Sequence, residues 1–239
     1  MIAVIGSGGK STTLKSIALL LSAKRKICCF TTTRMAASQL DFADKSYDSF
    51  QSFFADPSPP NISAVYTPDP MHVKTPFQLS DFPLFNNSEI LFVYEADGAK
   101  MLPLKFHKND PVFLPQTTHV ISVIGLKCLF QPLKDVCFRS ELFIQKYNQN
   151  KQQINGEQIV GLEEIEFARK EYISQWDRWD GEWRNFDYKF ESKNENVVVV
   201  NVFNQIDVVE KRVVDELREK YTRDAFGQEE IVQIVDKWF

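Results

Sequence analysis

The first thirty or so residues combine two apolar runs with a helical stripe between them. Residues 1–5 form an apolar run that ends at a glycine, and residues 26–33 form a second run of β-prone side chains. Between the two runs, over residues 10–24, apolar side chains recur at the spacing of an amphipathic helix with one face on a sheet. These side chains are Leu14, Ile17, Ala18 and Leu21. The pattern predicts a βαβ unit with a right-handed connection.

Three later apolar runs predict further strands. They cover residues 89–94 (EILFVY), 119–124 (HVISVI) and 197–203 (VVVVNVF). Because the runs are continuous rather than alternating, we expect central parallel strands that are covered by helices on both faces. The valine and leucine spacing over residues 207–221 predicts a helix, and the β-prone run 230–235 (EIVQIV) predicts a last strand.

Two segments interrupt this regular pattern. Residues 35–87 hold seven of the eleven prolines. Proline cannot donate to a β-ladder, so we expect loops there with short helical or edge-strand pieces. Residues 150–195 combine a helical stretch at 163–172 with the aromatic sequence WDRWDGEW, which predicts a small helical and aromatic insert. We predict that both segments elaborate a single domain spanning residues 1–239.

The junction of the first strand and the first helix has the sequence of a phosphate-binding loop (P-loop). Glycines allow the backbone to approach an anion closely, and the helix start adds free N–H donors and the positive end of its dipole. In such a loop Lys10 would reach the β- and γ-phosphates, Ser11 would ligate Mg²⁺, and Thr12 would support a phosphate oxygen. The full motif requires glycine where this chain has Val4, so the shortened form is similar to the loop of Mur-type ligases. The predicted nucleotide-binding residues are Gly6, Ser7, Gly8, Gly9, Lys10, Ser11 and Thr12.

Two carboxylates follow the predicted strand 89–94. Glu95 and Asp97 lie at its carboxyl end, where ligands gather in open α/β sheets. In phosphate-loop enzymes an acidic residue at this place helps to hold Mg²⁺ or positions the attacking water. We therefore predict Lys10, Glu95 and Asp97 as catalytic residues and Ser11, Glu95 and Asp97 as metal ligands. The alternative for Asp97 is a simple Asp-Gly turn that closes the strand.

The sequence after the run 197–203 leaves the choice of base open. Asn204-Gln205-Ile206-Asp207 resembles the N-K-x-D motif, in which the aspartate accepts hydrogen bonds from guanine. Asp207 is equally well placed as the N-cap of the following helix, with Glu210 completing a capping box. Asn204 and Asp207 are therefore candidate nucleotide-binding residues, and the predicted cofactor is Mg²⁺ with ATP or GTP.

Polar residues near the same sheet edge could contact a second substrate. Hydroxyl and guanidinium groups follow the second strand, where they could meet phosphate, Mg²⁺ or another anion. Lys100 follows Glu95 and Asp97 at the end of the predicted strand 89–94. The candidates are Thr31, Thr32, Thr33, Arg34 and Lys100. Lys105, with its neighbours His107 and Lys108, is predicted to lie on the surface.

Charge and cysteine usage narrow the class of protein. A net charge of −4 gives no electrostatic reason to expect nucleic acid or anionic lipid as a partner. No apolar window is long enough to span a membrane, and no signal peptide precedes the first strand, so a cytoplasmic protein is expected. The four cysteines form no C-x-x-C pair and are expected to be reduced, mostly buried thiols.

The motifs taken together resemble the selenium cofactor biosynthesis protein YqeC family. The resemblance rests on GSGGKST, TTTR, YEADGAKMLPLK, HVISVIGLKCLFQPL and VNVFNQID, and covers most of the chain. It implies a P-loop NTPase-like three-layer α/β fold with a mostly parallel central sheet, and a nucleotide-dependent accessory role for selenium-dependent molybdenum hydroxylases. The partner would be a client protein or a molybdenum cofactor intermediate. Two positions depart from the family pattern, because Phe138 replaces a histidine and Gln205 replaces the lysine of the base motif.

Three functions fit these features. The first is an Mg²⁺-dependent NTPase that serves as a maturation factor. The second is an ATP-dependent ligase or transferase that activates a small anionic substrate, as the Mur-like loop suggests. The third is a non-hydrolytic switch, for which an exposed aromatic patch would suit docking of a client. That patch would consist of Trp176, Trp179 and Trp183, which could equally form the core of the predicted insert.

Overall fold

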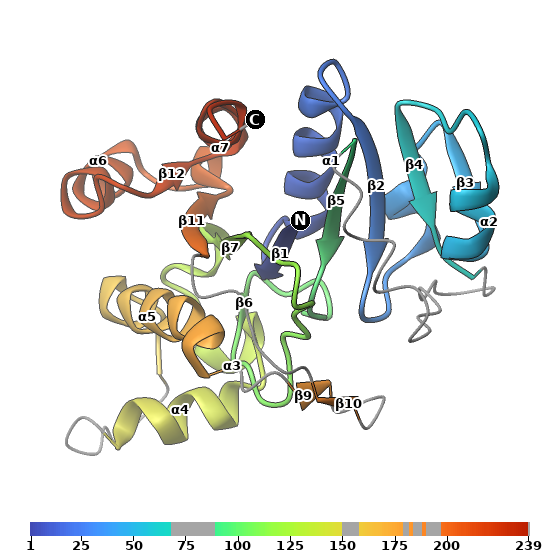
Figure 1. Cartoon of the computed structure of the whole chain (residues 1–239). Helices are drawn as coiled ribbons and strands as arrows, with labels where there is room; N and C mark the ends of the chain where they lie inside the picture. The colour runs from blue at the N-terminus through green and yellow to red at the C-terminus, as the bar shows by residue number, and fades with distance from the viewer. Residues whose placement is uncertain (68–88, 150–157, 179–181, 184–187, 190–196, 239) are drawn as a thin grey trace.

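The centre of the protein is an eight-stranded sheet in which every pair of neighbours is parallel (Figure 1). The computed structural model describes residues 1–67, 89–149, 158–178, 182–183, 188–189 and 197–238. The strand order is β12-β11-β7-β1-β5-β2-β4-β3. In chain order these strands are β1 (Ile2–Gly6), β2 (Lys26–Thr31), β3 (Lys45–Tyr47), β4 (Ile62–Val65), β5 (Ile90–Glu95), β7 (His119–Gly125), β11 (Val198–Asn204) and β12 (Ala225–Phe226).

Helices cover both faces of the sheet. The α-helices are α1 (Lys10–Leu21), α2 (Phe50–Ala55), α3 (Leu133–Val136), α4 (Ser140–Asn148), α5 (Leu162–Arg178), α6 (Lys211–Lys220) and α7 (Gln228–Asp236). One apolar cluster joins α1 and α7 to the face that carries Val4 and Val93. Another joins α2 and the end of α5 to the face that carries Ala3 and Tyr94. The predicted α/β class with a mostly parallel central sheet is confirmed, and the arrangement is consistent with the P-loop NTPase-like fold.

The shorter elements decorate this frame. Three 3₁₀ helices, η1 (Ala37–Leu40), η3 (Leu126–Cys128) and η4 (Ile206–Val208), connect longer elements. Two small pairings lie outside the main sheet, β6 (Leu104–Lys105) with β8 (Cys137–Phe138) and β9 (Glu182–Trp183) with β10 (Tyr188–Lys189). Among the described residues, no helix is both long and apolar enough to cross a membrane.

The proline-rich segment contributes to the sheet as far as the structure describes it. Within residues 35–67, η1, β3, α2 and β4 alternate, and β4 and β3 extend the sheet beyond β2. Residues 68–88 lie outside the described part. In the second irregular segment α5 spans the predicted helix 163–172, whereas residues 150–157, 179–181, 184–187 and 190–195 of the predicted insert lie outside the described part. The single-domain organisation stays a prediction.

The predicted last strand at residues 230–235 is wrong, because this segment belongs to α7. Ile231 and Val235 are buried at i, i+4 spacing and join the cluster around α1. Glu229 and Glu230 lie in the first turn of α7, where the helix dipole favours negative charge. Packing of one apolar face and the favourable first turn therefore prevail over the β-propensity of the isoleucines and valines.

The predicted start of the helix 207–221 is also wrong. Asp207 lies within η4, and α6 begins only at Lys211, with Glu210 in the N-cap position. Neither a capping hydrogen bond from the Glu210 side chain nor a capping box is present at this described helix start. Gln205 takes up a left-handed conformation with φ 59°, and the resulting turn separates β11 from α6 by more residues than the sequence suggests.

Candidate functional site

The glycine loop, residues 6–12, connects β1 to α1 through three left-handed glycines. Gly6, Gly8 and Gly9 have φ values of 91°, 79° and 126°. The loop also lies against the end of β7, because a Cβ added to Gly8 would come within 2.4 Å of the Gly125 Cα. Only glycine tolerates both the left-handed backbone and this close approach. The sequence pattern of the loop is thus explained by its local geometry.

Five consecutive backbone N–H groups of the glycine loop have no hydrogen-bond acceptor among the described residues. The N–H of Gly6 donates to Asp97 Oδ2 (2.9 Å) and that of Ser7 donates to the Val123 carbonyl (2.9 Å). Within the described residues, the N–H groups of positions 8–12 donate to no backbone carbonyl outside the helix and to no side chain. The first intrahelical bond of α1 comes from Thr13 to the Gly9 carbonyl. A row of free donors at a helix start fits an anion such as phosphate.

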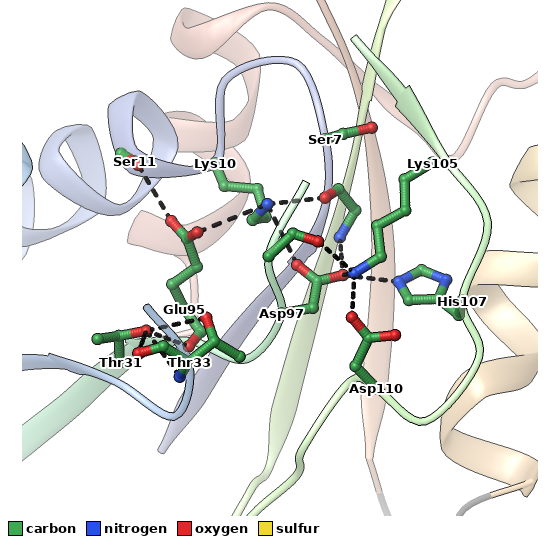
Figure 2. Close-up of polar contacts among 12 residues, drawn as sticks. Ser7, Lys10, Ser11, Thr31, Thr33, Glu95, Asp97, Lys105, His107 and Asp110 are labelled. Carbon is green, nitrogen blue, oxygen red and sulfur yellow. Dashed lines mark hydrogen bonds and ion pairs between the residues drawn. The ribbon is translucent and has the colours of Figure 1, made fainter. Parts of the chain in front are cut away.

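Lys10 turns inward, toward two carboxylates, rather than into solvent (Figure 2). Its side chain is 6% exposed, and its Nζ donates to the Gly6 carbonyl at 2.8 Å. The same Nζ lies 3.2 Å from Asp97 Oδ1 and 3.6 Å from Glu95 Oε1. Burial opposes the positive charge, but the two carboxylates outweigh it and raise the pKa of Lys10. Lys10 is therefore a buried ammonium ion at neutral pH.

Glu95 and Ser11 form the part of the predicted metal set that best fits Mg²⁺. The Ser11 hydroxyl donates to Glu95 Oε2 (3.0 Å) and accepts a bond from the Gln39 side chain (2.7 Å). Burial raises the pKa of Glu95, although Lys10 opposes this effect. Hydroxyl and carboxylate oxygens are the hard ligands that Mg²⁺ takes up together with phosphate oxygens. No group of three or more His, Cys, Asp or Glu side chains suited to a metal occurs among the described residues, so such a site would need oxygens from a nucleotide.

Asp97 has a different environment, because cations and N–H donors surround it. Its Oδ2 accepts bonds from Gly6 N (2.9 Å) and His107 Nε2 (2.6 Å), and lies 3.0 Å from Lys105 Nζ (Figure 2). Burial alone would raise the pKa of this carboxyl group, but Lys10 and Lys105 hold it below its usual value. Asp97 is thus a permanently ionised anchor between the glycine loop and the segment that follows β5.

The prediction that Lys105 and His107 lie on the surface is wrong. Lys105 is 0% exposed, and its Nζ contacts the Gly98 carbonyl (2.7 Å), Asp97 and Asp110. His107 is 6% exposed, and burial together with the nearby Lys105 lowers its pKa. Alternate residues of an extended segment point to the same side, so the i, i+2 spacing of Lys105 and His107 was the signal that could have placed both on Asp97.

Two residues from the C-terminal half of the chain, Tyr172 and Asn204, contact the glycine loop. The Tyr172 hydroxyl of α5 accepts a bond from Lys105 N (3.0 Å), donates to the Lys105 carbonyl (2.9 Å) and lies 3.4 Å from Ser7 Oγ. Asn204 Nδ2 donates to the Gly8 carbonyl at 2.8 Å. Asp207 is exposed on η4. The structure thus places Asn204 directly at the loop, while base recognition by Asp207 stays a prediction.

The candidates for a second substrate are divided between the interior and the surface. The buried hydroxyl groups of Thr31 and Thr32 donate to the Glu95 carbonyl (3.2 and 3.5 Å), so they connect β2 to β5. Thr33 is half-buried, whereas Arg34 and Lys100 are exposed. Thr12 is exposed at the first turn of α1. Arg34 and Lys100 are therefore the side chains of this group that remain accessible to a ligand.

Comparison with known proteins gives one match. No curated protein and no solved structure was found to match the chain. A family model described as "YqeC protein" matches residues 2–141, which is more than half of the 239 residues and includes the glycine loop, both carboxylates and Lys105. The family assignment predicted from the motifs is confirmed, and the chain belongs to the YqeC family.

Proposed function

We propose that this protein binds Mg²⁺ with ATP or GTP at the glycine loop and hydrolyses the nucleotide as a cytoplasmic maturation factor. Membership of the YqeC family suggests a selenium-related accessory role. The client in this proposal is a selenium-dependent molybdenum hydroxylase or an intermediate of its cofactor. The net charge of −4 supports a partner other than nucleic acid.

The observation that carries the proposal is the row of free N–H groups at positions 8–12, beside a buried lysine. Each free N–H is a hydrogen-bond donor already fixed in direction by the loop. The start of α1 adds the positive end of a helix dipole. Lys10 adds a full positive charge within the same turn of chain. The backbone N–H groups are preorganised donors of the kind that phosphoryl transfer requires, because catalysis there is mostly positioning and charge stabilisation.

The carboxylates of the site have distinct tasks in this proposal. Ser11 Oγ and Glu95 Oε2 lie 3.0 Å apart and would hold Mg²⁺, whose charge would stabilise the phosphates. Glu95, whose pKa burial raises, is the carboxylate suited to orient or accept a proton from an attacking water. Asp97 keeps the Gly6 N–H and the glycine loop in place.

The first test is equilibrium binding of Mg²⁺-ATP and of Mg²⁺-GTP to the purified protein. The key variant is Lys10→Met, and the matched control is Lys15→Met, which replaces an exposed lysine on the same helix. We expect one or both nucleotides to bind, with an affinity loss of about ten-fold or more in Lys10→Met and none in the control. If neither nucleotide binds to the folded wild-type protein, the proposed function is wrong.

A second test separates hydrolysis from a switch that only binds. Glu95→Gln keeps the size of the side chain and a hydrogen-bond acceptor for Ser11 but removes the charge. We expect this variant to retain nucleotide binding and to release phosphate about a hundred-fold more slowly than wild type, as loss of a general base does. Equal binding and no phosphate release by either protein, with the client present, would favour the non-hydrolytic switch.

A further inference from the structure

Two lysines share one buried carboxylate beneath the glycine loop. Lys10 Nζ lies 3.2 Å from Asp97 Oδ1, and Lys105 Nζ lies 3.0 Å from Asp97 Oδ2. The side chains of Asp97 and Lys105 are 0% exposed and that of Lys10 is 6% exposed, so solvent water hardly stabilises any of the three charges. The two lysines approach opposite oxygens, and Figure 2 shows them reaching Asp97 from different parts of the chain.

The two lysines are held very differently. Lys105 has three fixed partners, namely the Gly98 carbonyl, Asp97 and Asp110. Asp110 is itself held by Arg139, and the backbone of Lys105 is held on both sides by the Tyr172 hydroxyl. Lys10 depends on the carbonyl of Gly6, four residues away on its own loop, and on two carboxylates at 3.2 and 3.6 Å. Lys105 is therefore fixed, and Lys10 is the cation that can move.

Lys10 has to leave Asp97 in order to bind phosphate. In the present position its ammonium group donates inward to the Gly6 carbonyl, so it must break this bond and its two ion pairs to face a nucleotide. Removing the only cation from a buried carboxylate is strongly unfavourable, because it leaves an uncompensated charge in a low dielectric. Asp97 avoids this state, since Lys105, Gly6 N–H and His107 remain on Oδ2 after Lys10 has left.

We propose that Lys105 is a positioning residue for the nucleotide site, which keeps Asp97 paired and thereby releases Lys10 to the phosphates. The inference rests on the proposed nucleotide binding and adds a residue that acts through Asp97. It requires that the charge of Asp97, and not its shape, is what retains Lys10. A purely structural Lys105 would instead stabilise the segment after β5 without any specific link to Lys10.

The test is a double-mutant cycle in nucleotide affinity. In Lys105→Met, Asp97 has only Lys10 as its cation, so we expect affinity for Mg²⁺-nucleotide to fall about ten-fold or more. In Asp97→Asn the amide oxygen can still accept from the Gly6 N–H, but nothing anionic at this position retains Lys10, so the affinity of this variant is expected to be independent of Lys105. The double variant Lys105→Met/Asp97→Asn is then expected to recover to within about three-fold of Asp97→Asn alone. The matched control is Lys108→Met, which replaces an exposed lysine in the same segment and is expected to leave the affinity for Mg²⁺-nucleotide unchanged.

Each outcome discriminates. Equal affinity of folded Lys105→Met and wild type, or a double variant as weak as Lys105→Met, would overturn the inference while leaving the proposed function intact. If Lys105→Met does not fold, as judged by circular dichroism, Lys105→Gln takes its place in the cycle, because it also removes the charge while its amide can still donate to the Gly98 carbonyl. A ten-fold weaker affinity of folded Asp97→Asn would make Asp97 a direct part of the metal or phosphate site and would also overturn the inference. Failure of wild type to bind would instead count against the proposed function.

Discussion

The close approach of the glycine loop to the end of β7 makes Gly8 the most informative position for substitution. An added Cβ would lie 2.4 Å from the Gly125 Cα, 2.6 Å from the Gly125 N and 3.0 Å from the Pro103 carbonyl oxygen. These are backbone atoms of two other segments, so no side-chain rotation relieves the overlap. Forced overlap of this kind costs about 1–3 kcal/mol. The left-handed φ of 79° costs a non-glycine residue about 1–2 kcal/mol more.

The expected effect of Gly8→Ala is therefore a loss of about 2–5 kcal/mol in the free energy of unfolding. For a chain of this size it corresponds to a fall in melting temperature on the order of 10 °C. Gly98→Ala is the matched control, because a Cβ there meets no atom within 4 Å. Chemical denaturation of both variants and wild type, followed by circular dichroism, measures the difference directly. A Gly8→Ala protein as stable as Gly98→Ala would refute the packing of the loop against β7.

Three further predictions concern stability and reactivity. All four cysteine thiols are buried, and burial raises their pKa values, to about 12 for Cys128. A colorimetric thiol reagent should therefore react with none of them in the native protein and with all four after unfolding. Rapid reaction of the native protein would contradict this prediction. In a denaturation assay, Asp224→Ala should lower the free energy of unfolding by about 2 kcal/mol, because it leaves Arg169, which is 21% exposed, without its carboxylate partner. Glu166 is more exposed, so Glu166→Ala should lower it by only about 0–1 kcal/mol. Asn204→Ala removes the hydrogen bond to the Gly8 carbonyl, so a loss of about 1 kcal/mol is expected in the same assay, and no change would argue against this support of the loop.

The parts of the fold that could be predicted from the sequence are those in which local and tertiary preferences agree. The continuous apolar runs at β5, β7 and β11 are strands because helices cover them on both faces. Residues 230–235 show the opposite case, since their composition favours a strand and their packing against α1 favours a helix. Only the three-dimensional position of the segment decides between these two, and a linear pattern does not contain it.

The candidate site shows the same division. The glycine loop with Lys10 and Ser11 follows a short sequence motif, and Glu95 could be placed near it because both lie at the carboxyl ends of parallel strands. The burial of Lys105 and His107 does not follow from the sequence, because lysine is seldom buried without a partner and the partner of both side chains is Asp97, which follows β5. The support from Tyr172 could not be predicted either, because it arises from the packing of α5 against β6, more than sixty residues away in sequence.

The residues that contact the glycine loop come from both halves of the chain. The matched family region ends at residue 141, yet the glycine loop within it depends on Tyr172 and Asn204, which lie beyond that point. Tyr172 fixes the backbone of Lys105, which holds Asp97, which in turn holds the Gly6 N–H. Because Tyr172 also lies 3.4 Å from Ser7 Oγ, a change in the position of α5 would reach the glycine loop both directly and through Lys105 and Asp97. All of these contacts are made in the buried interior, where close packing leaves little free volume to absorb a displacement of one of the residues.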